Sequence, residues 1–320
     1  MNAVSADVSI RRIMVPLDGS ALAESALPAA VSLARHLDAR LTLLHVMERG
    51  APGRVHGQRH LTAIAEADQY LAAVGVRARA AGADADLHVH PNPEGNVPQS
   101  IVAHAGDLGA DLIVLATHGA GGARRAMFGS VAQQVLRRGL RPVLLIRPAD
   151  AERVEPPVEP DGLELQRLLV PLDGEPSAEA ALPFALTLGR AYRAEIALLR
   201  VVPTLATISG ERASAAKLVP TAAAATLEYE EAGAQRYLRA LADALRAAGA
   251  AVVWSVGRGD PAQGVLNAAS ATGADRTGLL IMATHGRTGL GAVFTGSVAS
   301  KIVGRYAGPV LLVRAPADSD

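Results

Sequence analysis

The sequence has 320 residues, 50% of them hydrophobic, and its 31 basic and 31 acidic side chains give a formal net charge of zero. This length suits two domains of ordinary size, and a neutral chain has no overall field that would draw it to nucleic acid or to an anionic membrane. The absence of cysteine excludes disulfides, thiolate metal sites and thiol catalysis.

The chain begins with Met1 to Arg12, which lacks the apolar core of a secretory signal. Farther along, charged residues, Gly or Pro interrupt every apolar run before it reaches the roughly 20 residues that span a bilayer. We therefore expect a soluble, cytoplasmic protein that has neither a membrane nor nucleic acid as its partner.

Short apolar runs alternate with longer helical patterns in the first half of the chain. Strands are predicted near residues 12–15, 41–46, 87–89, 112–115 and 143–146, and helices near residues 21–36, 61–81, 99–108 and 129–138. Strands that are almost wholly apolar are typical of a parallel sheet covered by helices on both faces, and the helices supply the right-handed crossovers that such a sheet requires. We expect a doubly wound α/β domain with five parallel strands, in which ligands bind beyond the carboxyl ends of the strands, where the strand order reverses.

The second half of the chain repeats the first. Residues 148–162 hold four prolines and little apolar periodicity, which predicts a linker between a domain at 1–147 and a domain at 163–320. The segment Ile13–Gly19 is answered by Leu168–Gly174 at an offset of 155 residues, whereas a later Ala-Thr-His-Gly motif recurs at an offset of 167. The sequence thus predicts a tandem repeat of two such sheets, and the second repeat has gained 12 residues after its second strand, in a longer helical region and a small later insert.

Each repeat carries a loop rich in glycine after its fourth predicted strand. The Ala-Thr-His-Gly motif ends at Gly119 or Gly286, nine residues follow, and a Gly-Ser pair then opens a helix. Glycine lets the backbone turn its N–H groups toward one point, and the first N–H groups of a helix favour an anion. The loop is suited to holding phosphates; the alternative is that Gly-Ser only ends a turn and caps a helix.

These motifs resemble the nucleotide-binding pattern of the universal stress protein family: Gly, two residues, Gly, nine residues, then Gly-Ser or Gly-Thr, preceded by a first strand that ends in a Pro- or Gly-x-Asp element. The likeness covers nearly the whole chain outside the linker and the N-terminal segment. It implies ATP as the ligand, with or without Mg²⁺. The candidate binding residues, by matching position, are Pro16, Asp18, Val46, Ala116, Gly119, Gly129, Ser130 and Val131 in the first repeat, and Pro171, Asp173, Val201, Ala283, Gly286, Gly296, Ser297 and Val298 in the second.

The resemblance also implies a role for each group of residues. The glycines and serines lie around the phosphates and the ribose, and the two aspartates lie beside the nucleoside near Pro16 and Pro171. Val46 and Val201, at the end of the second strand, contact the adenine.

Both repeats depart from the family pattern at its first glycine, which is Ala116 in one repeat and Ala283 in the other. A methyl group is tolerable there if the position needs only extended backbone, but it crowds the ligand if the glycine serves close approach. The second repeat has Gly257–Pro261 at the entry to its third helix, which resembles the family, whereas the first has Pro91–Gly95, whose prolines remove amide donors. We expect the second repeat to be the better site.

Two aspartates and several histidines suggest other chemistry. Asp18 and Asp173 could act as bases or metal ligands, but an aspartate at a strand end also accepts hydrogen bonds from the adjoining turn. The histidines at 56 and 60 and at 88 and 90 form two spaced pairs, but no nearby carboxylate completes a recognised zinc pattern, so we expect no metal site. Neither Lys217 nor Lys301 follows a glycine, which excludes a Walker A lysine.

The sequence therefore predicts an ATP-binding stress-response regulator or sensor with no assigned catalytic residue and at most slow ATP hydrolysis. We expect the two repeats to pair within the chain through their last strands, 143–146 and 310–313, and a homodimer is a further option. The main alternative is a structural or interaction protein of the same fold that binds no nucleotide, which the alanines favour. An enzyme of the related adenine-nucleotide α/β group is disfavoured because the Ser-Gly-Gly-x-Asp-Ser loop of the ATP pyrophosphatases is missing.

Overall fold

The protein forms two compact units, one for each repeat. The computed structural model describes residues 7–48, 54–55, 58–59, 61–91, 96–117, 129–147, 162–208, 214, 218–271, 276–284 and 298–315. The unit of the first repeat consists of Ser9–Glu164 together with Ala307–Leu312, and the unit of the second repeat consists of Met1–Val8, Leu165–Tyr306 and Val313–Asp320.

The first repeat is a doubly wound α/β sheet. Its elements are β1 (Arg12–Pro16), α1 (Ala21–Glu24), α2 (Leu27–Leu37), β2 (Arg40–Val46), β3 (Arg54–Val55), β4 (Gln58–Arg59), α3 (Ile64–Ala80), β5 (Ala85–His90), α4 (Val97–Asp107), β6 (Leu112–Ala116), α5 (Ser130–Arg138) and β7 (Val143–Ile146). The five long strands run parallel in the order β7-β6-β1-β2-β5, so the order reverses between β1 and β6. The predicted fold is confirmed, and β3 and β4 form a short antiparallel pair that the sequence analysis did not predict.

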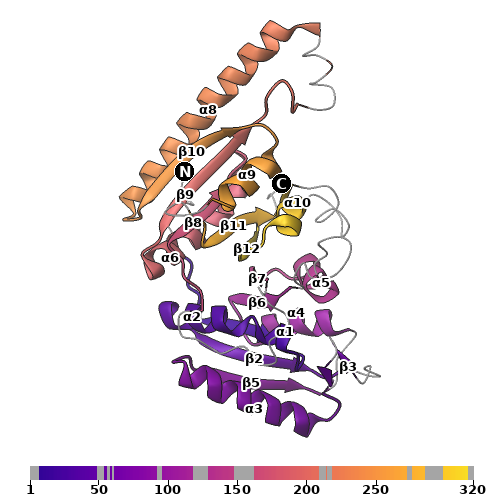
Figure 1. Cartoon of the computed structure of the whole chain (residues 1–320). Helices are drawn as coiled ribbons and strands as arrows, with labels where there is room; N and C mark the ends of the chain where they lie inside the picture. The colour runs from indigo at the N-terminus through magenta and orange to yellow at the C-terminus, as the bar shows by residue number, and fades with distance from the viewer. Residues whose placement is uncertain are drawn as a thin grey trace. The chain divides into compact units, whose positions relative to one another are not determined.

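Strands β1, β2, β6 and β7 are largely buried and mostly apolar, whereas the edge strand β5 is partly exposed. Ile13, Met14 and Val15 of β1 have no exposed surface. Helices cover both faces: Leu87 of β5 points toward Gly75 of α3, and the neighbouring residues of β5 point toward α4 on the opposite face. Figure 1 shows α3 running alongside β5.

The first predicted helix is interrupted. One helix is expected over residues 21–36, but the chain forms α1 and then starts again as α2. Pro28 is the cause, since a proline has no N–H to donate to the preceding turn and is tolerated only in the first turn of a helix.

The second repeat has the same architecture. Its elements are β8 (Arg167–Pro171), the 3₁₀ helix η1 (Pro176–Ala181), α6 (Leu182–Tyr192), β9 (Glu195–Val202), α8 (Pro220–Ala247), β10 (Val252–Arg258), α9 (Pro261–Ala269), β11 (Leu279–Thr284), α10 (Val298–Arg305) and β12 (Val310–Arg314). The strand order is β10-β9-β8-β11-β12. The order reverses between β8 and β11, the equivalents of β1 and β6.

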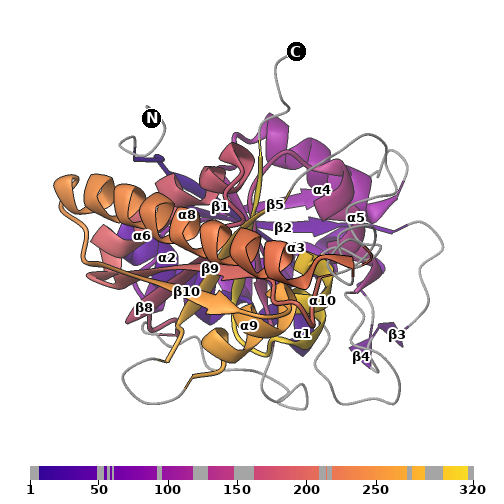
Figure 2. The same cartoon turned by 90° about the horizontal axis from the view of Figure 1, so that it is seen from above.

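Most of the 12 added residues lie in the N-terminal part of α8, the equivalent of α3. α3 ends at Ala80 and α8 at Ala247, already at the later offset of 167, and α8 has 28 residues where α3 has 17. The addition therefore lengthens the N-terminal part of α8, which packs on β9 and β10 and projects beyond them (Figures 1 and 2). The small insert at 276–278 is offset by a shorter connection between β10 and α9, whose N-cap Asp260 corresponds to Asn96 of α4.

Part of β12 belongs to the unit of the first repeat. Within that unit, Val310–Leu312 pairs antiparallel with Val143–Leu145 of β7. These are the last strands of the two repeats; the pairing of the repeats as whole domains stays a prediction.

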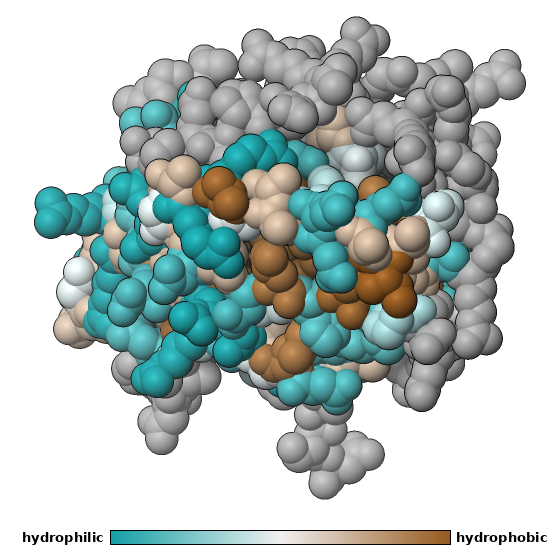
Figure 3. All heavy atoms as spheres, turned by 90° about the horizontal axis from the view of Figure 1, so that it is seen from below, coloured by the Kyte–Doolittle hydropathy of each residue, from teal (hydrophilic) through white to brown (hydrophobic). Residues whose placement is uncertain are grey.

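The surface is mixed in character. From below, it is mostly hydrophilic with small apolar areas between the polar side chains (Figure 3), and Ile64 and Val76 are exposed apolar residues of α3. Within the ranges given above, none of the helices has the length and apolar character needed to cross a bilayer.

Candidate functional site

A cavity of about 550 Å³ lies at the carboxyl ends of β8, β9 and β11 in the second repeat. This is the place where the strand order reverses, which is where open α/β sheets bind their ligands. Helices α8, α9 and α10 complete the walls. The volume lies within the usual range of small-molecule sites, roughly 300–1,000 Å³.

The walls of the cavity are apolar with a few polar groups. The apolar part includes Leu199, Val201, Met282, Val298 and Ile302. The polar groups come from different elements and are Asp173 after β8, Arg200 on β9, Glu230 on α8 and Thr284 on β11. Such a lining suits a flat apolar group together with a charged or hydroxylated one.

Arg200 is held against the turn that follows β8. A Cβ atom on Gly174 would lie 2.6 Å from an Arg200 guanidinium nitrogen, so a larger residue there would displace the guanidinium from its present position. The guanidinium also lies 5.6 Å from the centroid of the Tyr237 ring, a cation–π distance. The packing fixes a positive charge on the wall of the cavity.

Tyr237 is in turn fixed by a carboxylate. Its hydroxyl donates to Glu179 Oε1 at 2.9 Å. Burial, more than the hydrogen bond and the charge of Glu179, raises the pKa of Tyr237 above its usual value, so the phenol stays protonated. Arg200, Tyr237 and Glu179 therefore form one connected group at the side of the cavity.

Both repeats place an Asp-Gly turn after the first strand. Asp18 Oδ1 accepts from the backbone N–H of Ser20 at 2.9 Å and from its hydroxyl at 2.6 Å, and Asp173 Oδ1 accepts from the N–H of Glu175 at 2.9 Å. The following glycine has a φ of 86° in the first repeat and 92° in the second, a conformation that other residues rarely adopt. One oxygen of each aspartate thus shapes the turn.

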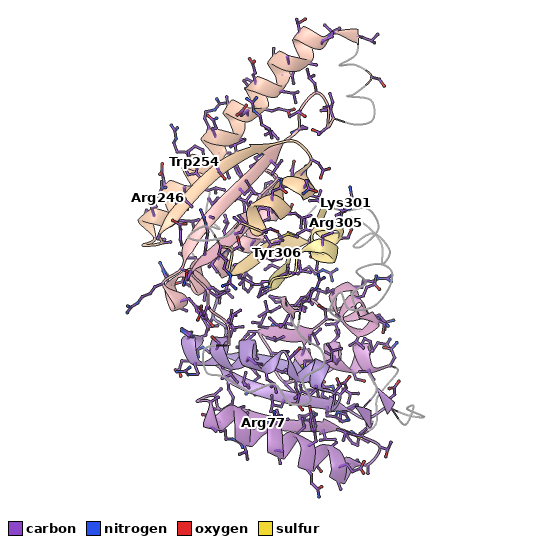
Figure 4. The ribbon with its side chains drawn as sticks, in the orientation of Figure 1. Arg77, Arg246, Trp254, Lys301, Arg305 and Tyr306 are labelled. Carbon is purple, nitrogen blue, oxygen red and sulfur yellow. The ribbon has the colours of Figure 1, made fainter. Side chains whose placement is uncertain are left out.

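The first repeat builds the equivalent position differently. His45 stands where the second repeat has Arg200, is only 1% exposed, and donates from Nδ1 to the carbonyl oxygen of Leu17 at 2.7 Å. Arg77, which projects from α3 (Figure 4), forms an ion pair with the buried Glu24 carboxylate. Tyr70 lies beside that carboxylate, and burial first, then the Glu24 charge, raises the pKa of its hydroxyl.

The predicted binding residues fall into three groups. Those of the second repeat that line the cavity are Pro171, Asp173, Val201, Ala283 and Val298. Those of the first repeat at the corresponding strand and helix ends are Pro16, Asp18, Val46, Ala116, Gly129, Ser130 and Val131. Gly119, Gly286, Gly296 and Ser297 lie outside the described residues. The helix that the Gly-Ser pair of the first repeat was predicted to open is present, with Gly129 as N-cap of α5.

The two alanines that replace a family glycine lie in extended backbone. Ala116 ends β6 and Ala283 lies near the end of β11. Among the residues that the structure describes, Asp38 and Arg193 are the non-glycine residues with positive φ, so the backbone at both alanines is one that alanine readily adopts. Any effect of the alanines on a ligand would come from the methyl group alone.

Sequence reasoning missed the charged group beside the cavity. Arg200, Glu230, Tyr237 and Glu179 were not among the candidates. A signal was present, since Glu24 recurs as Glu179 at the offset of 155 residues, and Tyr70 recurs as Tyr237 at 167. This recurrence becomes visible only once the change of offset is known to fall at the start of α8.

Comparisons with known proteins agree with the repeat. A family model described as the universal stress protein family matches residues 9–147 and 164–314. Universal stress protein YxiE of Bacillus subtilis (strain 168) is 29% identical over 155 residues, which are 42% of this chain and 98% of that protein. The crystal structure of a universal stress protein from Archaeoglobus fulgidus DSM 4304 covers 96% of this chain and 99% of its own, at 18% identity and a TM-score of 0.68.

A shorter solved structure matches less of the chain. It is a universal stress protein in complex with cAMP, and the match covers 44% of this chain and 98% of that one, at 25% identity and a TM-score of 0.34. Such relatives have the length of one repeat.

Proposed function

The chain belongs to the universal stress protein family, and from this premise we propose that it binds ATP in the cavity of the second repeat and acts as a nucleotide-dependent stress-response regulator or sensor. The observation that carries the proposal is the cavity itself, because five residues chosen from the family pattern line one space at the switch point of the sheet. The proposed setting is the cytoplasm.

The lining divides in a way that fits the parts of a nucleotide. Val201 and the neighbouring apolar residues of β9 offer a surface for the adenine, and Asp173 offers a carboxylate oxygen to ribose hydroxyls. Arg200 supplies a positive charge for a phosphate. The first described turn of α10 adds helix N–H groups and the positive end of the helix dipole.

Mg²⁺ would be held mainly by the nucleotide itself. Phosphate oxygens and a carboxylate such as Asp173 are the hard ligands that this ion prefers. Hydrolysis is expected to be slow at most, because Asp173 is exposed and the sequence has no Walker A lysine to stabilise charge on a transferred phosphoryl group.

The alternative function is that of an interaction protein that binds no nucleotide. The observation that favours it is the methyl group of Ala283 on the wall of the cavity. A titration of ATP by isothermal calorimetry decides between the two, because the proposed function requires saturable binding and the alternative requires none.

A matched pair of variants assigns the binding to one repeat. Ala283→Leu fills part of the cavity, and Ala116→Leu makes the same change at the equivalent strand end of the first repeat. We expect one ATP per chain for the unchanged protein, loss of that binding in Ala283→Leu, and retention in Ala116→Leu. Equal binding by all three proteins contradicts the proposed site, and no binding of ATP, ADP or AMP by the unchanged protein contradicts the proposed function.

A further inference from the structure

Three histidines of the first repeat lie together on β5 and α4. His88 and His90 are two residues apart on β5, so their side chains leave the same face of the strand. His104 reaches them from α4: its ring centroid lies 5.0 Å from that of His88 and 4.3 Å from that of His90. One ring nitrogen from each histidine lies within 4.8 Å of the other two, and all three side chains are partly exposed.

The orientation of His104 leaves one nitrogen available as a ligand. Its Nδ1 lies 2.9 Å from the carbonyl oxygen of Ser100, one turn earlier in α4. A carbonyl oxygen can only accept, so Nδ1 carries the proton and Nε2 keeps its lone pair. A hydrogen bond from the second ring nitrogen to a backbone carbonyl is a common arrangement of metal-bound histidine.

The cluster is not required by the fold. The register of the parallel strands places Ser255 and Gly257 of β10 where β5 has His88 and His90. Ala268 of α9 lies eight residues after the N-cap Asp260, as His104 lies eight residues after Asn96. The second repeat thus builds the same strand and helix with none of these histidines.

We propose that His88, His90 and His104 form a binding site for a divalent transition-metal ion of the Zn²⁺ type, with the fourth position open to water or another ligand. The ion ties the edge strand β5 to helix α4. No metal site was expected from the sequence, because no nearby carboxylate completes a zinc pattern with the histidines at 56 and 60 or at 88 and 90. The third ligand proposed here is a histidine on another element, 14 residues after His90.

The chemistry of the three side chains suits such an ion. Neutral imidazole is a preferred ligand of Zn²⁺, and three protein ligands with one open position is a known arrangement. Nitrogens bound to a tetrahedral zinc ion are about 3.3 Å apart, so modest side-chain rotation closes the present spacing.

Zinc titration of the untagged full-length chain tests the proposal. After dialysis against a chelator, ZnCl₂ is titrated by calorimetry, and thermal unfolding is followed with and without zinc. We expect one Zn²⁺ per chain and a higher unfolding temperature with zinc, since the ion binds the folded form.

The variants copy the second repeat, so that each change is known to fit the fold. His88→Ser and His104→Ala introduce the residues found at Ser255 and Ala268. We expect each to weaken zinc binding by more than the roughly 10- to 100-fold that the loss of an outer partner of a ligand causes, and to remove the thermal shift. Zinc affinity that is unchanged in His104→Ala overturns the proposal.

Two controls separate this site from other histidines. His36 on α2 is exposed and makes the same local bond as His104, from Nδ1 to the carbonyl oxygen of Ser32 at 2.8 Å; His36→Ala should bind zinc as the unchanged protein does. The double change His56→Ala/His60→Ala concerns residues outside the described ranges and should also leave the binding unchanged. Loss of zinc in either control, with retention in His88→Ser, assigns the ion to another place and overturns the proposal.

Discussion

The end of the second strand differs between the two repeats. In the first repeat, His45 is buried and bonded to the main chain, and Arg77 holds the Glu24 carboxylate. In the second repeat, Arg200 lines a cavity, and the carboxylate of Glu179 accepts from Tyr237 instead. The strand order and the Asp-Gly turn are the same in both.

The difference shows what a duplicated fold keeps and what it can change. The turns and buried strands are needed by the sheet and are the same in both repeats. The partner of the carboxylate after the first strand differs between the repeats. Glu24 is paired with Arg77 of α3, whereas Glu179 accepts from Tyr237, and the second repeat has Ala244 at the position of Arg77. The first repeat thus uses Arg77 to neutralise its buried carboxylate, whereas in the second repeat a tyrosine binds the carboxylate and Arg200 lies on the wall of the cavity.

The largest expected effect is on the ion pair of the first repeat. Arg77→Ala leaves the Glu24 carboxylate, 7% exposed, without its cation. Breaking a buried pair by removing one partner leaves an uncompensated charge, and we expect a loss of about 3 kcal/mol in the free energy of unfolding. Urea unfolding followed by circular dichroism measures it.

The control for this prediction removes the charge as well. In Glu24→Gln/Arg77→Ala no buried carboxylate is left, so most of the lost stability should return. If the double variant is as unstable as Arg77→Ala, the lost stability comes from the packing of the arginine stem and not from its charge.

The next effect is on ligand affinity in the second repeat. Arg200→Ala removes the cation from the cavity wall, and we expect ATP to bind roughly 10- to 100-fold more weakly, since a hydrogen bond to a charged group contributes about 1.5–3 kcal/mol. Calorimetric titration of ATP measures the change. His45→Ala, the equivalent change in the first repeat, should leave the affinity as it was; equal effects of the two variants would remove the proposed difference between the repeats.

Much of the fold could be predicted from the sequence because its signals are local. Apolar runs such as that of β1 predict the strands, the constant offsets predict the repeat, and the change of offset from 155 to 167 predicts the longer helical region that contains α8. The break between α1 and α2 was missed although Pro28 signalled it. A proline can lie inside a pattern that otherwise reads as one helix, and its position in the first turn of α2 is clear only once the boundary is known.

The site could be predicted only where a family motif fixed its residues. Asp173 and Val201 were predicted because they occupy positions of the family motif. Arg200 was not, because it contacts Tyr237, which is 37 residues away, and no spacing rule links the two. The same limit applies to the histidine cluster, in which His104 meets β5 only after α4 has packed on the sheet. Side chains from different elements meet through tertiary packing, which local patterns do not encode.

The smallest expected effect concerns the two equivalent tyrosines. Tyr237→Phe removes a hydrogen bond to Glu179 and should cost about 1 kcal/mol. The buried Tyr70 hydroxyl lies beside the Glu24 carboxylate but makes no hydrogen bond of standard geometry within the described part of the chain. Tyr70→Phe therefore removes an unsatisfied polar group and should leave the stability unchanged or slightly raised. Hydrogen exchange of amides in β2 and β9 measures the stability of each repeat separately. If Tyr70→Phe lowers the stability as much as Tyr237→Phe does, then Glu24 accepts a hydrogen bond from a tyrosine as Glu179 does, and the proposed difference is wrong.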